Sequence, residues 1–276
     1  MLVSLKEILK NDQTVLGFNV FGYEDSMAVI KAAEELNMPV ILMTNKDAVN
    51  FMPIEMFGLM LGKLAKDSKV PVCVHLDHST SMEDIERAIN AGYTSVMFDG
   101  SQLEFEENVS KTQAVVEIAH KHNVSVEAEI GAVGYSDPRV KARAIYTDPC
   151  EAAEFAVKTE VDALAVAIGT VHRMVMQEAR IDYDLLKRIN EKVDIPLVIH
   201  GASGAKDEDI VRMCKNGVGK INFGTTLRMA FGKTLRQVIE TEKEEFDRLK
   251  LFVKPIEAVK EKAKEKMLLT VVEENR

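Results

Sequence analysis

The stretch "PLVIHGASG" at residues 196–204 ends an apolar run with a histidine and continues into a glycine-rich turn. The same arrangement occurs in "VCVHLDHST" (72–80) and "LAVAIGTVHR" (164–173). Short runs rich in Val and Ile favour buried β-strands. Their histidines come together only if the three strands are parallel, because the carboxyl ends of parallel strands lie at one edge of a sheet. The fold therefore depends on how many such runs the chain contains.

Eight apolar runs, separated by amphipathic stretches, extend along most of the chain. The predicted strands are "VLGFNV" (15–20), "PVILMT" (39–44), "VPVCVHLD" (70–77), "SVMFDG" (95–100), "SVEAEIG" (125–131), "ALAVAIG" (163–169), "PLVIHG" (196–201) and "KINFG" (220–224). Between them, stretches such as "SMAVIKAAEELN" (26–37) and "SMEDIERAINAG" (81–92) predict helices. Thr80 and Glu83 have the spacing of a capping box at the start of the second helix.

Strands that alternate with helices indicate a parallel sheet of the α/β class with right-handed crossovers. Eight such units close into a (β/α)₈ TIM barrel. A doubly wound open sheet is the alternative, but no GxGxxG follows the first strand. No Pro/Gly/Ser-rich linker divides the chain, so residues 1–276 are predicted to form a single TIM-barrel domain. The charged stretch 241–250 predicts a helical face, and 253–274 predicts an additional C-terminal helix that packs on the barrel or on another subunit.

The composition narrows the classes of partner. The 276 residues are 46% hydrophobic and carry a formal net charge of −9, which disfavours a nucleic-acid partner. Cys73, Cys150 and Cys214 are far apart and show no metal-type pairing, so we expect reduced thiols and a cytoplasmic location. No segment reaches the roughly 18–20 apolar residues of a membrane span, and no signal peptide is expected.

Polar side chains recur at the carboxyl ends of the predicted strands. They are Asn19, Thr44, Asn45, Asp77, His78, Asp99, Ser101, Glu127, Glu129, His172, His200 and Asn222. One such histidine is more often a hydrogen-bonded structural residue, but three from different strands, with acidic neighbours, favour a metal site. Three imidazoles leave an open position on Zn²⁺, with Co²⁺ or Fe²⁺ as alternatives, and such an ion polarises a carbonyl and stabilises an enolate-like oxyanion.

Two further features indicate the type of chemistry. Asp77 precedes His78 and is positioned to carry a proton to or from a hydroxyl, although it would alternatively orient a ligand imidazole. The glycine-containing segments 200–209 and 222–228 each lead into a predicted helix after the seventh and eighth strands, where barrels often bind phosphate. The sequence therefore predicts a metal centre beside a site for an anionic substrate.

The motifs "VHLDHS", "SVMFDGS", "VEAEIG", "YTDPCEAAEF", "VDALAVAIGTVH", "LVIHGASG" and "KINFGTT" together resemble the class II, metal-dependent fructose-bisphosphate and tagatose-bisphosphate aldolases over nearly the whole chain. The resemblance implies zinc held by His78, His172 and His200, with Asp77 as the acid/base group on the C4 hydroxyl. Asp99 and Glu129 match positions that bind a second or alternate metal ion. Residues expected to bind the substrate or its phosphate are Asn19, Asn45, Arg173, Gly201, Ala202, Ser203, Asn222, Phe223, Gly224 and Thr225.

The reaction implied by this resemblance is the reversible cleavage of a phosphorylated ketose between C3 and C4. The products are dihydroxyacetone phosphate and an aldehyde, as in glycolysis and related carbohydrate metabolism. A homodimer or homotetramer and a monovalent cation, Na⁺ or K⁺, are also implied. A Schiff-base aldolase would need a buried lysine late in the sixth strand, and "ALAVAIG" contains none. A metal-dependent hydrolase on the same barrel would not require two phosphate loops.

Several positions depart from the family pattern. Arg173 stands where a glycine usually follows the second histidine ligand and meets the phosphate and the monovalent cation. In "GYSD" (134–137), Tyr135 and Asp137 occupy the second-glycine and catalytic-glutamate positions of a Gly-Gly-x-Glu loop. Asn45 replaces a serine that contacts the aldehyde-side phosphate, and Gly224 replaces an aspartate.

These departures lead to two hypotheses. Arg173 offers a charged fork to an anionic group, unless it turns to solvent, and Asp137 carries a proton at shorter reach. The alternative substrate is another acidic or monophosphorylated ketose, and the alternative protein is a metal-binding relative with little turnover.

Overall fold

The computed structural model describes residues 1–11, 13–137 and 143–271. Eight parallel strands close into a barrel in the order β1-β10-β9-β7-β5-β4-β3-β2. They are β1 (Val15–Asn19), β2 (Val40–Thr44), β3 (Val72–Ser79), β4 (Ser95–Phe98), β5 (Ser125–Ile130), β7 (Ala163–Val166), β9 (Leu197–Ile199) and β10 (Val218–Phe223). Each lies within or overlaps one of the eight predicted runs, and the predicted TIM barrel is confirmed.

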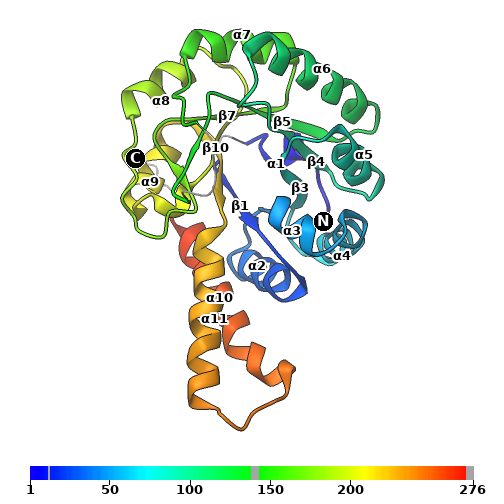
Figure 1. The fold of residues 1–276 in the computed structure, drawn as a ribbon, viewed down its shortest axis with the longest axis vertical. Coiled ribbons are helices and arrows are strands. Elements are labelled where there is room, and N and C mark those ends of the chain that lie inside the picture. Colours follow the sequence, from blue (N-terminus) through cyan, green and yellow to red (C-terminus); the bar gives the residue numbers. More distant parts are fainter. Residues whose placement is uncertain (12, 138–142, 272–276) are drawn as a thin grey trace.

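Helices surround this barrel on its outer face (Figure 1). They are α2 (Tyr23–Leu36), α4 (Ile54–Asp67), α5 (Met82–Asn90), α6 (Phe105–Lys121), α7 (Pro149–Thr159), α8 (Tyr183–Asn190), α9 (Asp207–Lys215) and α10 (Thr225–Thr241). Shorter elements, α1 (Leu5–Ile8), α3 (Lys46–Phe51) and the 3₁₀ turn η1 (Ala202–Gly204), occupy connections and one barrel end. A two-stranded sheet of β6 (Gly134–Tyr135) and β8 (Val171–His172) lies outside the barrel sheet.

The alternation of side chains in β2 explains why the strands are apolar on both faces. Ile41 and Met43 belong to the core inside the barrel, together with Leu5 of α1, whereas Val40 and Leu42 belong to the larger core between the strands and the helices. Both faces of each strand are therefore removed from water, which is typical of parallel barrels. The inner core fills one end of the barrel and leaves the carboxyl ends of the strands for polar residues.

The C-terminal segment forms a helical hairpin. Helix α11 (Arg248–Leu268) packs against α10 and α2, and the hairpin extends away from the barrel (Figure 1). The additional helix is thus confirmed, and its residues Val259, Ala263 and Met267 are buried.

Two local predictions were wrong. Residues 241–250 do not form one helical face, because α10 ends at Thr241 and Asp247 caps α11 by accepting a hydrogen bond from the Leu249 N–H. The capping residue of α5 is Ser81, whose hydroxyl accepts from the Asp84 N–H at 3.2 Å. Ser81 and Asp84 have the same spacing as Thr80 and Glu83, one residue later, so the sequence pattern was ambiguous. Within the described ranges, no helix is both long enough and apolar enough to span a bilayer.

Candidate active site

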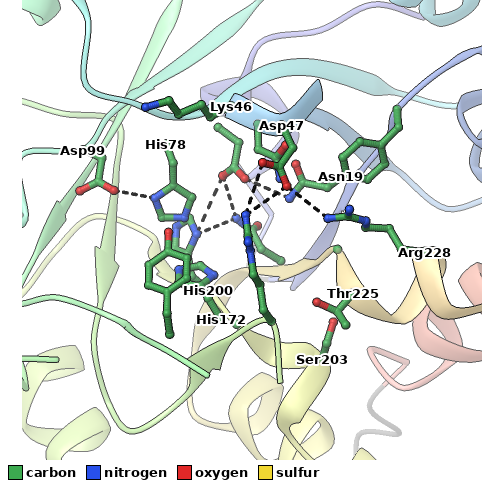
Figure 2. A pocket seen from close by; sticks show the side chains of 18 of the residues that line it. Asn19, Lys46, Asp47, His78, Asp99, His172, His200, Ser203, Thr225 and Arg228 are labelled. Carbon is green, nitrogen blue, oxygen red and sulfur yellow. Dashed lines mark hydrogen bonds and ion pairs between the residues drawn. The ribbon is translucent and has the colours of Figure 1, made fainter. Parts of the chain in front are cut away.

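A cavity of about 390 Å³ opens at the carboxyl ends of the barrel strands (Figure 2). Its lining contains groups from nearly every predicted strand end. The lining residues are Asn19, Phe21, Asn45, Lys46, Asp47, Asp77, His78, Thr80, Asp99, Tyr135, His172, Arg173, His200, Gly201, Ser203, Asn222, Gly224, Thr225 and Arg228. Four of the predicted site residues do not form part of this lining: Glu129, Ala202 and Phe223 are buried, and Asp137 lines a neighbouring cavity.

Three imidazoles converge at one side of the cavity. His78 lies near the end of β3, His172 in β8, and His200 directly after β9. Their ring centroids are 4.4 Å (His78–His200), 4.8 Å (His78–His172) and 5.8 Å (His172–His200) apart. One ligand atom of each lies within 4.8 Å of the others. The sequence predicted this convergence from three separate strand ends.

His78 is held in an uncommon backbone conformation. Its φ of 52° lies in the left-handed region, which costs free energy for a residue other than glycine, and such strain is often retained at functional sites. Its Nδ1–H donates to Asp99 Oδ2 at 2.7 Å. Among the described side chains, His78 Nε2 and Glu129 Oε2 are buried and lack a hydrogen-bond partner. A second group of ligand atoms within 4.8 Å of one another comes from His78, Asp99 and Glu129.

A buried ion pair between Glu127 and Lys220 fixes the orientation of the His200 ring. The His200 Nε2–H donates to Glu127 Oε1 at 2.9 Å, and Lys220 Nζ donates to Glu127 Oε2 at 2.6 Å. The Lys220 and Glu127 side chains are both fully buried, so each charge depends on the other for compensation. Since Nε2 carries the proton, Nδ1 is left as the electron-pair donor facing Asn222 and the cavity.

Protonation equilibria also favour a cation here. Burial lowers the pKa values of His172 and His200 well below the usual range, with a further decrease from His78, so both imidazoles are neutral and able to coordinate. Burial opposes protonation of His78, yet the carboxylates of Asp77 and Asp99 raise its pKa to about 10. The carboxylates around His78 carry more negative charge than the nearby cationic groups compensate. The imidazoles and carboxylates gathered here are therefore suitable ligands for a divalent metal ion.

Asp77 is the carboxylate that faces the imidazole cluster from β3. Asn19 Nδ2 donates to its Oδ2 at 3.0 Å, and His200 Nδ1 lies 3.9 Å from its Oδ1. Burial raises the pKa of Asp77, but the nearby positive charge of His78 outweighs this effect and lowers it. The group is thus ionised, fixed in place and able to accept a proton.

Two loops form the lower side of the cavity in Figure 2, where Ser203 and Thr225 are labelled. Gly201 has a φ of 69°, and a Cβ there would lie 2.8 Å from the Val171 carbonyl carbon, so only glycine fits. Ser203 Oγ accepts from the Thr226 N–H at 3.2 Å, which joins the loop after β9 to the start of α10. The two predicted phosphate loops are therefore adjacent.

Comparison with known proteins places this geometry in a family. The family model for class II fructose-bisphosphate aldolase matches residues 1–275. A fructose-bisphosphate aldolase from Staphylococcus aureus is 39% identical over 276 residues, covering 96% of each chain. The chain belongs to the class II fructose-bisphosphate aldolase family. The members of this family are zinc-dependent lyases.

Solved structures agree with this assignment. The YdjI aldolase from Escherichia coli K12 is 37% identical and superposes with a TM-score of 0.86 over 98% of each chain. A fructose-bisphosphate aldolase from Campylobacter jejuni, at 21% identity, has a TM-score of 0.78 over 96% of this chain and 93% of its own. The second likeness concerns the fold alone.

Three positions that depart from the class II aldolase pattern make defined contacts in the structure. Arg173 has a φ of 59°, so the chain keeps the left-handed backbone that suits the usual glycine but adds a long cationic side chain. This side chain lines the cavity and contacts Asp137 and Asp47, and it remains 40% exposed to solvent. The Tyr135 ring lies 4.7 Å from the His172 ring at an interplanar angle of 30°. Asn45 caps α3 by accepting from the Ala48 N–H at 3.2 Å.

Three charged residues that line this aldolase site, Lys46, Asp47 and Arg228, were not among the predicted site residues. Asp47 and Arg228 line the cavity, and Arg228 Nη1 donates to Asp47 Oδ2 at 3.3 Å across 181 residues of sequence. Arg228 lies about one helical turn after Gly224, which belongs to the predicted phosphate loop. Residues one turn apart lie on the same side of a helix, so this spacing could have identified Arg228 from the sequence. Asp47 follows the second strand end by three residues, but no motif distinguishes it from a solvated acidic residue.

Proposed function

We propose that this class II aldolase uses Zn²⁺ to cleave a phosphorylated ketose reversibly into dihydroxyacetone phosphate and an aldehyde. The substrates that fit the family are fructose 1,6-bisphosphate and tagatose 1,6-bisphosphate. The observation that carries the proposal is the group of three buried or half-buried imidazoles, with ligand atoms within 4.8 Å of one another. In this proposal residues 1–276 act as one aldolase domain, in the cytoplasm and as a homodimer or homotetramer.

His78 Nε2, His172 and His200 Nδ1 would hold the zinc ion. Asp99 and Glu129 would provide a second or alternate position with His78, consistent with the unpartnered Glu129 Oε2. When bound, zinc supplies Lewis-acid polarisation of the substrate carbonyl. A monovalent cation beside Arg173 remains a prediction.

Proton transfer is assigned to two aspartates. Asp77 would take the proton from the C4 hydroxyl during cleavage and return it during synthesis, and its buried hydrogen bond from Asn19 fixes the direction of its carboxylate. Asp137 would move the proton at C3 of dihydroxyacetone phosphate. Its carboxylate is 11% exposed and is paired with Arg173 at 3.1 Å.

The phosphate of dihydroxyacetone phosphate would bind between the two glycine loops. Gly201, Ala202 and Ser203 approach from one side, and Asn222 with the segment 223–225 from the other. The support is the contact between these loops and the start of α10, whose first N–H groups are suited to an anion. Asn19 and Asn222 would face the sugar hydroxyls from the strand ends.

A second candidate substrate is an acidic or monophosphorylated ketose other than the two bisphosphates. The observation that favours it is the side chain of Arg173 within the cavity, at a position where the family usually has glycine. The metal centre and the proton carriers would be unchanged in this case. The difference would lie in the far end of the ketose.

The decisive experiment combines metal analysis with product analysis. Protein depleted with a chelator and reloaded with Zn²⁺ should release dihydroxyacetone phosphate from at least one of the two bisphosphates, their monophosphates or related acidic ketoses. His172→Ala should lose zinc and activity together, whereas His120→Ala, on a solvent-exposed histidine of α6, should lose neither. Stoichiometric zinc without cleavage of any of these ketoses would instead identify a metal-binding relative with little turnover.

A further inference from the structure

The three imidazoles of the metal-binding side (Figure 2) are not anchored in the same way. His78 donates through Nδ1–H to Asp99, and His200 donates through Nε2–H to Glu127. Both lie at the ends of barrel strands, whereas His172 lies in β8, outside the barrel sheet. Within the described part of the chain, no group is hydrogen-bonded to the His172 ring. Since a ligand imidazole usually has its orientation fixed by such a bond, another contact must hold this ring.

The contact that takes this place is the ring of Tyr135. The centroids of the Tyr135 and His172 rings are 4.7 Å apart, and their planes are inclined by 30°, so the two rings stack obliquely. His78 and His200 meet the same imidazole at much steeper angles of 79° and 61°. Aromatic pairs fix the relative geometry of two rings in addition to burying them. Tyr135 therefore restricts the rotation of the His172 ring, and it lines the cavity as well.

The backbone reinforces this stack. The two residues of β6 pair in parallel register with the two residues of β8, so Tyr135 stands beside His172. The next residue, Ser136, donates twice to the His172 carbonyl oxygen, through its N–H at 3.0 Å and through its hydroxyl at 3.1 Å. The segment that contains β6 is thus fastened to the short strand that carries the metal ligand.

The same segment leads to Asp137, the proposed carrier of the C3 proton. Asp137 lies two residues after Tyr135, and its carboxylate accepts from Arg173, which directly follows His172, at 3.1 Å. Residues 135, 136 and 137 are therefore all joined to the chain around His172. A displacement of the Tyr135 ring would also displace Asp137, and a misplacement of about 1 Å can slow a reaction about 10²-fold.

We propose that Tyr135 is a positioning residue of this aldolase: its ring orients the metal ligand His172 and, through the same contact, keeps Asp137 in place for proton transfer. This inference rests on the proposed function. The class II aldolase pattern has a glycine at this position, which offers no ring and leaves the backbone more freedom. The tyrosine thus links the metal ligand and the proton carrier in this chain.

The first measurement is the rate at which zinc leaves the protein, followed with a chelating dye. Tyr135→Gly should release zinc about 2- to 10-fold faster than the wild type, because the His172 ring is no longer held against rotation. Tyr135→Phe keeps the stack and should release zinc within about twofold of the wild-type rate. Tyr23→Gly removes an exposed tyrosine at the start of α2, outside the 390 Å³ cavity, and should not change the rate.

The second measurement separates the two proton transfers at saturating zinc. Tyr135→Gly should slow exchange of the C3 proton of dihydroxyacetone phosphate about 10- to 100-fold, since Asp137 loses its fixed place. Hexacyanoferrate(III) oxidises the three-carbon carbanion before it is protonated, so cleavage in its presence bypasses that step. Cleavage measured in this way should stay within about threefold of the wild type, because Asp77 is held separately by Asn19. Tyr135→Phe should restore the exchange.

The inference requires both effects. A wild-type rate of either zinc release or proton exchange in Tyr135→Gly would overturn it and leave the aldolase function standing. Equal losses in exchange and in cleavage would refute the positioning of Asp137. A Tyr135→Phe protein as impaired as Tyr135→Gly would assign the effect to the hydroxyl and refute the role of the ring.

Failure of the proposed function would give a different result. The wild-type protein would then neither cleave a ketose nor exchange the C3 proton of dihydroxyacetone phosphate. The zinc release rates would still decide whether the Tyr135 ring orients His172, because they do not depend on turnover.

Discussion

The imidazole cluster and the charged cluster of Asp47, Arg173 and Arg228 share one cavity but differ in how their charges are held. Around the metal-binding side, the side chains of Asp77, Glu127 and His200 are 3%, 0% and 1% exposed, and each makes fixed hydrogen bonds. In the cluster of Asp47, Arg173 and Arg228, the three charged side chains are 40–51% exposed and contact mainly one another. Buried charges without partners are costly, whereas exposed ion pairs are worth about 0–1 kcal/mol each. The charged groups on the metal-binding side of the cavity are thus fixed by burial and hydrogen bonds. The exposed charged groups on the other side can exchange their partners.

The largest loss of catalytic activity is expected for a substitution of Asp77, which lies on the buried, metal-binding side of the cavity. Asp77→Asn keeps the shape of the side chain but removes the proton acceptor, so kcat for cleavage should fall about 10²- to 10⁴-fold. Zinc content and Tm should be unchanged, because Asn19 still has an oxygen to which it can donate. A coupled assay with metal analysis measures both. An Asp77→Asn enzyme with full kcat would remove Asp77 from the proton-transfer role.

Asp137 connects the two sides of the cavity, because it forms an ion pair with Arg173 and is also proposed to move a proton. Asp137→Asn should slow exchange of the C3 proton of dihydroxyacetone phosphate with solvent by about 10²-fold. The amide oxygen can still accept from Arg173, so the cluster of Asp47, Arg173 and Arg228 should keep its geometry. Deuterium exchange followed by NMR is the measurement. Exchange at the wild-type rate would assign that proton to another group.

Substitution of Glu127 and Lys220 tests whether metal binding depends on the buried ion pair that orients His200. Changing Glu127 alone would strand a buried lysine, so the paired variant Glu127→Gln/Lys220→Met is the informative one. Zinc affinity should fall about 10- to 100-fold, because His200 loses the charged acceptor that orients it. Competition with a chelating dye gives the Kd, and the Tm of the metal-free variant shows whether the fold is intact. An unchanged Kd in a folded variant would contradict the idea.

Arg173 should give the smallest of these effects. Arg173→Gly places the residue that favours a φ of 59° at this position, so the fold should tolerate it. The loss of one exposed guanidinium should raise KM for ketoses with an anionic aldehyde half by roughly tenfold, with kcat nearly constant. Substrate-dependent steady-state kinetics decide the point. If substrate preference and KM were the same as in the wild type, Arg173 would have no part in recognition.

The fold was largely predictable because the formation of its strands and helices depends on patterns of neighbouring residues. Each barrel strand needs apolar side chains on both faces, and helices need a 3.6-residue pattern, so the order of elements is written in the chain. The errors were at element ends, where Ser81 and Thr80 offer equivalent caps and where the charged segment 241–250 turns between two helices. Helix boundaries depend on a few competing hydrogen bonds, which sequence patterns distinguish poorly.

The candidate site was predictable only in part. His78 and His200 follow from the rule that parallel strands present their carboxyl ends together, and His172 reaches the same place from β8, the short strand that follows β7. Asp47 and Arg228 do not follow from it, because they lie within the helices after the strand ends and meet across 181 residues of sequence. Nothing in the local sequence of either residue indicates its partner.

The chain by itself specified eight strands, their helices and the residue types at the strand ends, since burial and helical periodicity act over neighbouring residues. Only the folded barrel decided which charges face one another: that Lys220 compensates Glu127 beneath His200, and that Asp47 occupies the space between Arg173 and Arg228. The physical reason is that electrostatic pairing depends on distance and exposure in space, and barrel closure sets both for residues far apart in sequence.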